Sequence, residues 1–395
     1  MSEVTLSIPG SDSREPDNRI PLLNSANAQE ARRVLDLCNA CRYCEGFCAT
    51  FQALSQRREV LWQELDYFSN LCHNCTACYH ACQYAPPHEF SINVPLALGR
   101  VRADSYQRYA WPGFLAPLFQ RNGLILSLVT AVVLSLILVI GSLFLNHQVL
   151  FAQLSQPGAF YTIVSHRLMV TVAGLVFLYG LVSMTISVRR FCLDCGTAGG
   201  KGSWRGLKQA LQSAATLRYL GGGHGQGCNT ENEGYSNQRR VYHQLTMWGF
   251  LLCFAATCAA TLYELGLGRI SPFPYFSLPV ILGASGGVAI LVGTAGLTWT
   301  KLRTDTRPAD VSSYGMDFGF LALLFFVSLT GLVLLGLRET SAMGVLLLVH
   351  LGFVLSLFLV LPYSKFVHAI YRFAALVCFH EEELQQNRQS HQSDT

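Results

Sequence analysis

The sequence predicts an all-α membrane protein in which a small cysteine-rich helical domain precedes a bundle of six membrane-spanning helices. Its 395 residues are 51% hydrophobic and only 13% charged, and most of the charge lies outside long apolar runs. Apolar runs of about 20 residues are long enough to cross a bilayer as helices. Two cysteine runs lie near the N-terminus, and Leu54, Leu61, Leu65 and Phe68 recur between them at helical spacing.

The first 30 residues are expected to form a disordered tail. They are polar, contain Pro9, Pro16 and Pro21, and lack the apolar core of a signal peptide. Cysteines of a chain that is not exported stay in a reducing compartment, where metal or cluster ligation is commoner than disulfide formation. The net charge of +4 reflects loop arginines and does not indicate nucleic-acid binding.

The two cysteine runs share the spacing C-x2-C-x2-C-x3-C. A doubled run of this kind is typical of ferredoxins with two [4Fe–4S] clusters, whereas zinc sites lack three cysteines at successive C-x2-C spacing. In such ferredoxins the fourth cysteine of each run binds the other cluster. The expected ligands are therefore Cys38, Cys41, Cys44 and Cys82 for one cluster, and Cys72, Cys75, Cys78 and Cys48 for the other. We expect residues 31–95 to form an α-helical ferredoxin domain.

A second domain over residues 118–379 is expected to contain the six spans. They are predicted at 123–145, 163–188, 242–265, 276–300, 318–337 and 344–372. Residues 96–117 are expected to connect the domains at the membrane surface, and residues 380–395 to form a polar tail. Lysine and arginine gather in the loops 189–241 and 301–310, which places both termini and the cluster domain on the cytoplasmic side of a bacterial-type inner membrane.

The last predicted span carries two histidines. His350 and His368 are 18 residues apart, which is five turns, so we expect them to project from one face of a single helix. The rise between them is about 27 Å, close to the hydrocarbon thickness of about 30 Å. Histidine inside a membrane helix is a functional candidate, and a hydrogen-bonded core histidine is the alternative.

The predicted orientation sorts the histidines by depth. His166 and His350 are expected near the outer surface, and His243 and His368 near the inner surface. Two pairs at two depths are what two b haems with bis-histidine ligation require, so the bundle is predicted to be cytochrome b-like. His147 in an outer loop is the alternative outer ligand.

The loop 189–241 contains three more cysteines beside a glycine run. Cys192, Cys195 and Cys228 are candidates for a third metal site, with free thiols on a flexible loop as the alternative. The glycine run is not a G-x-G-x-x-G motif after a strand, so no dinucleotide-binding fold is indicated. Clusters and haems pass single electrons, so the chain is predicted to be an electron relay and not itself the dehydrogenase.

Several segments resemble a known family. They are LCNACRYCEGFCATF, CHNCTACYHACQYAPPHEFSINVP, RYLGGGHGQGCN, RRVYHQLTMWGF and LPYSKFVH, and they are similar to the tricarballylate/citrate utilisation protein B family from about residue 31 onward. The last predicted helix is also similar to cytochrome b subunits of the nitrate reductase gamma type. The resemblance implies that electrons come from a partner FAD-dependent dehydrogenase that oxidises tricarballylate, and pass through clusters and haem to quinone. The pair Cys192 and Cys195 departs from the family pattern.

Two other functions fit the same motifs. The chain could run in reverse, as a quinol-oxidising subunit that feeds a cytoplasmic reductase of the heterodisulfide type. It could also be a membrane redox sensor or anchor without turnover, although this class usually carries an output domain. The soluble protein that the chain binds would show in which direction electrons flow, and therefore its role as an oxidoreductase component.

Overall fold

The computed structural model describes residues 25–119, 122–195, 203–222, 225–229 and 231–393, and the side chains as far as residue 390. Helices are the regular secondary structure of the described residues, which contain no strand and only an isolated bridge between Cys228 and Ser236. The predicted all-α fold is therefore confirmed. Of the tail expected over residues 1–30, residues 1–24 lie outside the described part of the chain. Residues 26–30 are helical, because they begin α2 (Ala26–Cys41), whose N-terminus Ser25 caps.

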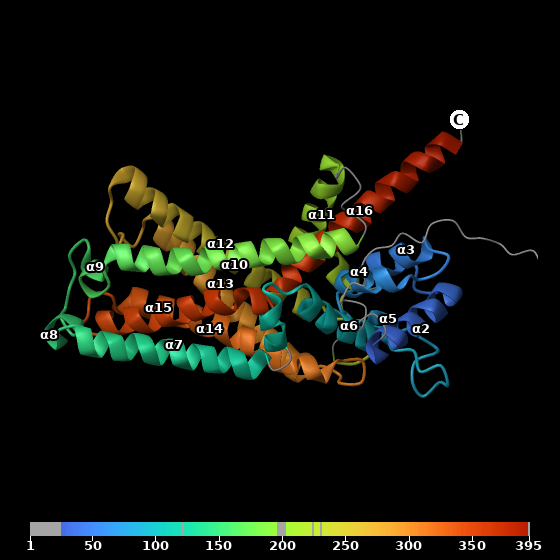
Figure 1. Cartoon of the computed structure of the whole chain (residues 1–395), viewed down its shortest axis with the longest axis horizontal. Helices are drawn as coiled ribbons and strands as arrows, with labels where there is room; N and C mark the ends of the chain where they lie inside the picture. Colours follow the sequence, from blue (N-terminus) through green and yellow to red (C-terminus); the bar gives the residue numbers. More distant parts are fainter. Residues whose placement is uncertain (1–24, 120–121, 196–202, 223–224, 230, 394–395) are drawn as a thin grey trace, which may run out of the picture.

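Six helices are long and apolar enough to cross a membrane, as predicted. They are α7 (Asn122–Phe144), α10 (His166–Asp194), α12 (Gln238–Leu267), α13 (Leu278–Leu302), α14 (Tyr314–Leu337) and α15 (Met343–Val360). They lie side by side along the long axis of the molecule (Figure 1). Many of their large apolar side chains are exposed, which is the surface that a lipid bilayer would cover.

The two ends of the bundle differ. The short helices α8 (His147–Leu150) and α9 (Ala159–Ile163) lie at one end, and the cluster domain lies at the other (Figure 1). At the first end the Gly158 amide donates to the Ser271 carbonyl at 2.9 Å, and Arg338 donates to the Phe273 carbonyl at 2.6 Å. The C-terminal helix emerges at the end that carries the cluster domain (Figure 1).

The cluster domain contains five helices, α2, α3 (Ala49–Ser55), α4 (Leu65–Leu71), α5 (Ala77–His80) and α6 (Val94–Tyr109). The structure differs from the expected interfacial connector over 96–117, because α6 packs against α2 and α4 and buries Leu98, Val101 and Tyr106. Arg108 of α6 forms a buried ion pair with Asp66 of α4. Only the 3-10 turn Gly113–Phe119 remains as a connector to α7.

The last predicted span is not one helix. α15 ends at Val360, a 3-10 turn covers Leu361–Tyr363, and a new helix, α16, runs over Val367–Ser393. Pro362 cannot donate a helical hydrogen bond, and Ser364 has an extended backbone. Lys365 holds the break in place through an ion pair with Asp317 of α14 at 2.7 Å. His350 and His368 therefore lie on different helices, and the prediction that they project from one face of a single helix is wrong.

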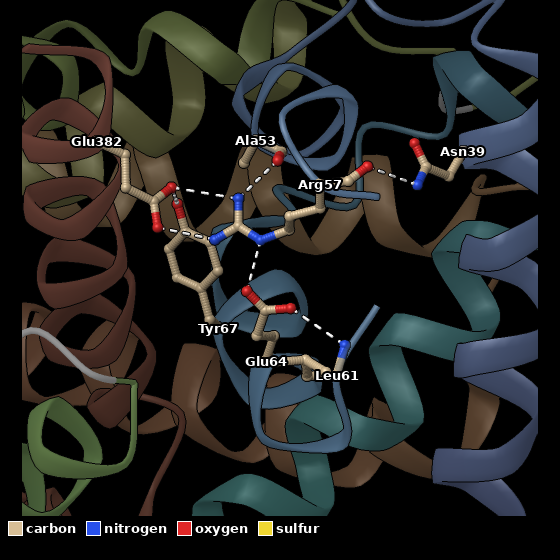
Figure 2. A network of polar contacts seen from close by, with 7 residues as sticks. All are labelled: Asn39, Ala53, Arg57, Leu61, Glu64, Tyr67 and Glu382. Carbon is tan, nitrogen blue, oxygen red and sulfur yellow. Dashed lines mark hydrogen bonds and ion pairs between the residues drawn. The ribbon is translucent and has the colours of Figure 1, made fainter. Parts of the chain in front are cut away.

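The expected polar tail over 380–395 is instead the second half of α16, as far as Ser393. Phe379 and His380 are buried. A hydrogen bond of 3.0 Å joins His380 Nε2 to the Ser213 hydroxyl of α11 (Trp204–Thr216). Figure 2 shows Arg57 of the cluster domain between the carboxylates of Glu64 and Glu382. The Tyr67 hydroxyl donates to the same Glu382 carboxylate at 3.0 Å (Figure 2). α16 thus connects the membrane helices to the cluster domain.

Candidate functional site

One cavity, which Cys78 of the other predicted set also borders, is lined by the four cysteines predicted to bind the first cluster. They are Cys38, Cys41, Cys44 and Cys82, and aromatic side chains of Tyr43, Tyr84 and Phe90 surround them. Arg42 ends α2 in a left-handed conformation with φ 56°, which turns the chain so that its cysteines face the cavity. Burial raises the pKa of Cys38 to about 12, and the neighbouring thiols of Cys44, Cys82 and Cys41 add to this rise. The fourth cysteine of the second run therefore lies with the first run.

The other four predicted ligands line a second cavity. They are Cys48, Cys72, Cys75 and Cys78. Cys48 precedes α3, and left-handed residues Asn74 and Thr76 fold the loop so that its cysteines face Cys48. Burial raises the pKa of Cys48 to about 11, with the neighbouring Cys72 as the next cause. Cys48 of the first run therefore lies with the second run, and Cys82 of the second run lies with the first, as a crossed two-cluster arrangement requires. That these thiols bind clusters stays a prediction.

The donor set suits an iron–sulfur cluster, because four thiols line each cavity and cysteine thiolates are the ligands of [4Fe–4S] clusters. Among the described residues, no three His, Cys, Asp or Glu side chains are close enough to hold one metal ion. The thiols are instead spread around cavities, as the ligands of a cubane are. Cluster ligation requires thiolates, and crowded buried thiols resist deprotonation, so the positive iron core would have to stabilise them.

Three arginines hold the second cysteine loop, and the sequence did not single them out. Arg102 of α6 and Arg372 of α16 donate to the Cys72 carbonyl at 2.8 and 2.9 Å. Arg239 of α12 donates to the Asn74 carbonyl at 2.6 Å. His73 lies beside them, and burial followed by the charge of Arg372 lowers its pKa well below the usual range, so it is neutral.

The glycine run of the loop 189–241 has a structural role. Gly222 has φ 66°, and a Cβ on it would lie 1.7 Å from the Gly227 carbonyl oxygen, so only glycine fits this turn. The turn places Cys228 and Asn229 against the second cysteine loop, where the backbone N–H of Asn229 donates to the Cys75 carbonyl at 3.2 Å. This part of the loop therefore covers the second cavity.

The structure does not bring together the three cysteines considered for a third metal site. The buried Cys228 thiol donates to the Leu220 carbonyl at 3.0 Å and neighbours Cys75. Cys195 instead faces Cys378 and Asp66, which with burial raise its pKa, and Cys192 lies one turn before it on α10. The two groups are held by different neighbours, so the suggested Cys192, Cys195 and Cys228 site is wrong.

The expected inner histidines meet. The ring centres of His243 on α12 and His368 on α16 are 6.0 Å apart, with an angle of 83° between the ring planes. An atom bound between two imidazole nitrogens at about 2 Å each would hold the ring centres at about this separation. His368 Nδ1 donates to the Lys365 carbonyl, which leaves Nε2 available as a ligand. His243 Nδ1 is buried and has no hydrogen-bond partner among the described residues. The pair therefore fits a bis-histidine haem.

The expected outer histidines do not meet. His166 Nε2 lies 3.1 Å from the Glu264 carboxylate, which also accepts from the Tyr161 hydroxyl. His350 Nδ1 lies 3.1 Å from the Thr330 hydroxyl of α14, and its ring packs on Gly331. No described contact joins His166 to His350, so this pair does not show the spacing of the inner pair. The alternative ligand, His147, is exposed at the start of α8.

Comparisons with known proteins cover both domains. Residues 117–390 match the family model described as citrate utilization protein B, and residues 31–108 match its Fer4-like domain. A protein of Escherichia coli named citrate utilization protein B is 45% identical over 350 residues, which is 88% of this chain and 90% of that protein. No solved structure matches the chain.

Proposed function

Because this chain belongs to the citrate utilization protein B family, we propose that it is the membrane electron-transfer subunit of a tricarboxylic-acid oxidising system. It would accept electrons from a soluble FAD-dependent dehydrogenase and deliver them to membrane quinone. The substrate of the partner would be citrate, tricarballylate or a close analogue, as the name of the Escherichia coli relative and the family resemblance suggest. The protein itself would not be the dehydrogenase.

One observation carries this proposal. The two cysteine-lined cavities and the His243–His368 pair lie at the same end of the membrane bundle, and the helices of the two histidines touch the second cysteine loop. A chain with two cluster sites joined to a histidine pair of this spacing is built to move single electrons between a soluble donor and the membrane. The Fer4-like family model over residues 31–108 supports the cluster sites.

The residues present indicate how each group would be held. Cys38, Cys41, Cys44 and Cys82 would hold one [4Fe–4S] cluster, and Cys48, Cys72, Cys75 and Cys78 the other. His243 and His368 would hold a b haem near the inner surface, which accepts and returns one electron when bound. The second haem, between His166 and His350, stays a prediction and takes no part in the route proposed. We propose a cytoplasmic cluster domain because the arginine-rich loops lie on its side.

The test is to purify the complex from the membrane in mild detergent and identify the flavoprotein that accompanies it. Citrate, tricarballylate and succinate are then added separately under anaerobic conditions, and the haem absorption spectrum is followed. We expect a tricarboxylic acid to reduce the haem only when the flavoprotein is present, and added quinone to reoxidise it. A preparation with neither cluster iron nor haem would overturn the proposal.

A further inference from the structure

The two cysteine loops differ in their access to solvent. In the loop of the first cavity Cys41 is exposed, and the Tyr43 side chain is 68% exposed. In the loop of the second cavity Cys72 and His73 are only 8% and 7% exposed. The first site is therefore open to a redox protein in solution, whereas the second is enclosed by the rest of the chain.

The enclosing groups come from the two helices that carry the inner histidines. Arg372 lies one turn after His368 on α16, and its Nη2 and Nε donate to the Cys72 and Asn70 carbonyls at 2.9 and 3.3 Å. Arg239 lies one turn before His243 on α12, and its Nη1 and Nη2 donate to the Asn74 and His73 carbonyls at 2.6 and 3.4 Å. Each histidine helix thus binds the backbone of the second cysteine loop directly.

We propose that the cluster held by Cys48, Cys72, Cys75 and Cys78 is the one that passes electrons to the haem between His243 and His368. Arg239 and Arg372 are the positioning residues for this step. The cluster held by Cys38, Cys41, Cys44 and Cys82 receives the electrons from the soluble flavoprotein. This order rests on the proposed function, because it presumes that clusters and haem are bound.

The transfer step is balanced by one electron. With both groups bound, one electron would leave the cluster held by Cys48, Cys72, Cys75 and Cys78 and reduce the haem held by His243 and His368, and no proton or leaving group would move. Two hydrogen-bonded arginines serve this step in two ways. Their positive charges favour the more negative, reduced state of the adjacent cluster, since the potential of a cluster depends on nearby charge and hydrogen bonds. Their forked contacts also fix the Cys72 loop to the backbone one turn from each haem ligand.

A competing explanation is that these arginines only anchor the cluster domain to the membrane helices. The variants Arg372→Gln and Arg239→Gln remove the charge and the fork, and Arg372→Lys keeps the charge alone. Arg205→Gln is the charge-matched control, because Arg205 is exposed on α11 and contacts neither cysteine loop. All four variants keep the eight cysteines and both histidines, so the cofactor content can be compared directly.

The measurement is a potentiometric titration of the purified complex, followed by electron paramagnetic resonance, which resolves each reduced cluster. We expect Arg372→Gln to disfavour reduction of one cluster about tenfold, which is about 59 mV for one electron, and to leave the other unchanged. Arg372→Lys should restore most of the shift, and Arg205→Gln should cause none. Equal shifts in the reduction potentials of both clusters, or no shift in either potential, would contradict a specific role of Arg372 at one cluster.

The variants Cys41→Ala and Cys75→Ala, each lacking one cluster, test the order itself. With a photoreduced small-molecule donor, haem reduction should continue in Cys41→Ala and should slow at least tenfold in Cys75→Ala, while the remaining cluster is still reduced. The opposite result would overturn the order but not the proposed function. If wild type contains no haem or no clusters, the proposed function fails as well. If the Cys41→Ala and Cys75→Ala variants do not fold or do not bind the remaining cofactors, the potentiometric titrations of the arginine variants test the proposal.

Discussion

Arg57 of the cluster domain and Glu382 of α16 form an ion pair with 2.8 Å between Nη2 and Oε1, although one residue lies in each domain of the protein. The same guanidinium donates to Glu64 at 2.6 Å and to the Ala53 carbonyl at 2.6 Å. Because α16 carries His368 near its start, this contact connects the cluster domain to the far end of the helix that carries one of the two inner histidines.

Arg57→Ala should loosen this connection. The side chain is only 14% exposed, and its loss removes the cation that Glu64 and Glu382 share, so we expect the free energy of unfolding to fall by about 1–3 kcal/mol. The check is the melting temperature of the detergent-purified protein, together with hydrogen exchange over the second half of α16. Arg388→Gln, an exposed change on the same helix, is the control. A double-mutant cycle of Arg57 with Glu382 should give a coupling of about 1 kcal/mol, and zero coupling would show that the pair is incidental.

The cluster sites predict the metal content. Two cubanes give about eight cluster irons per chain, and the reduced protein should show two interacting paramagnetic centres. Cys44→Ala should remove the centre whose other ligands are Cys38, Cys41 and Cys82, and leave the second intact. Cys253→Ala is the control, because Cys253 lies on α12 away from both cavities. Zinc in place of iron, without such centres, would end this interpretation.

The inner histidine pair predicts that two substitutions have one result. His243→Ala and His368→Ala should each remove the same low-spin haem, because one imidazole cannot hold a bis-histidine haem alone. Absorption and electron paramagnetic resonance spectra would show the same species lost from both variants. Gln244→Ala, a change at the neighbouring position on α12, should leave the haem in place. Different haems lost from the two variants would disprove the pairing.

The outer histidines allow a sharper test, because sequence and structure lead to different expectations. The two-haem prediction requires His166→Ala and His350→Ala to remove a second haem together. The hydrogen bond of His166 to Glu264 gives this side chain another partner at 3.1 Å. The first measurement is the number of haems per wild-type chain, since a single haem would contradict the prediction of two haems at two depths. If His147→Ala instead matches His350→Ala, the outer ligand was misassigned.

The sequence was sufficient for features that depend on local spacing. Apolar length predicted six membrane-spanning helices, and the described residues contain six candidates. The doubled cysteine run predicted two groups of four thiols, and these groups line two cavities, while cluster binding stays a prediction. The sequence was insufficient where the tertiary environment decides. The separation of 18 residues suggested that His350 and His368 share one helical face. The helix is instead interrupted at Pro362, and the Lys365–Asp317 ion pair stabilises the interruption. The polar end of α16 resembles a tail in sequence, and it is ordered by partners such as Arg57 that are distant in the chain.

The roles of Arg239 and Arg372 were hidden for a similar reason. Arginine at the cytoplasmic end of a membrane helix is expected from the distribution of positive charge alone. Only the folded chain shows that both guanidinium groups donate to carbonyls of one cysteine loop. The i, i+4 spacing of Arg239 with His243 and of His368 with Arg372 was the available signal, because residues at this spacing share a helix face.

The last prediction concerns flavin. The described part of the chain has no strand, and the sequence contains no dinucleotide-binding fingerprint, so the isolated polypeptide should bind no stoichiometric FAD and oxidise no organic acid. Because the clusters would take electrons singly from a flavin that gives two, acid oxidation should begin only when a soluble flavoprotein is added, and quinone should then be reduced. The measurement is flavin fluorescence after acid extraction of the purified chain, together with anaerobic quinone reduction with and without the flavoprotein. The Cys75→Ala variant is the matched control, since it should still allow the flavoprotein to be reduced by its acid but should not reduce quinone. One FAD per isolated chain, or acid oxidation without a partner, would show that the dehydrogenase site lies in this protein.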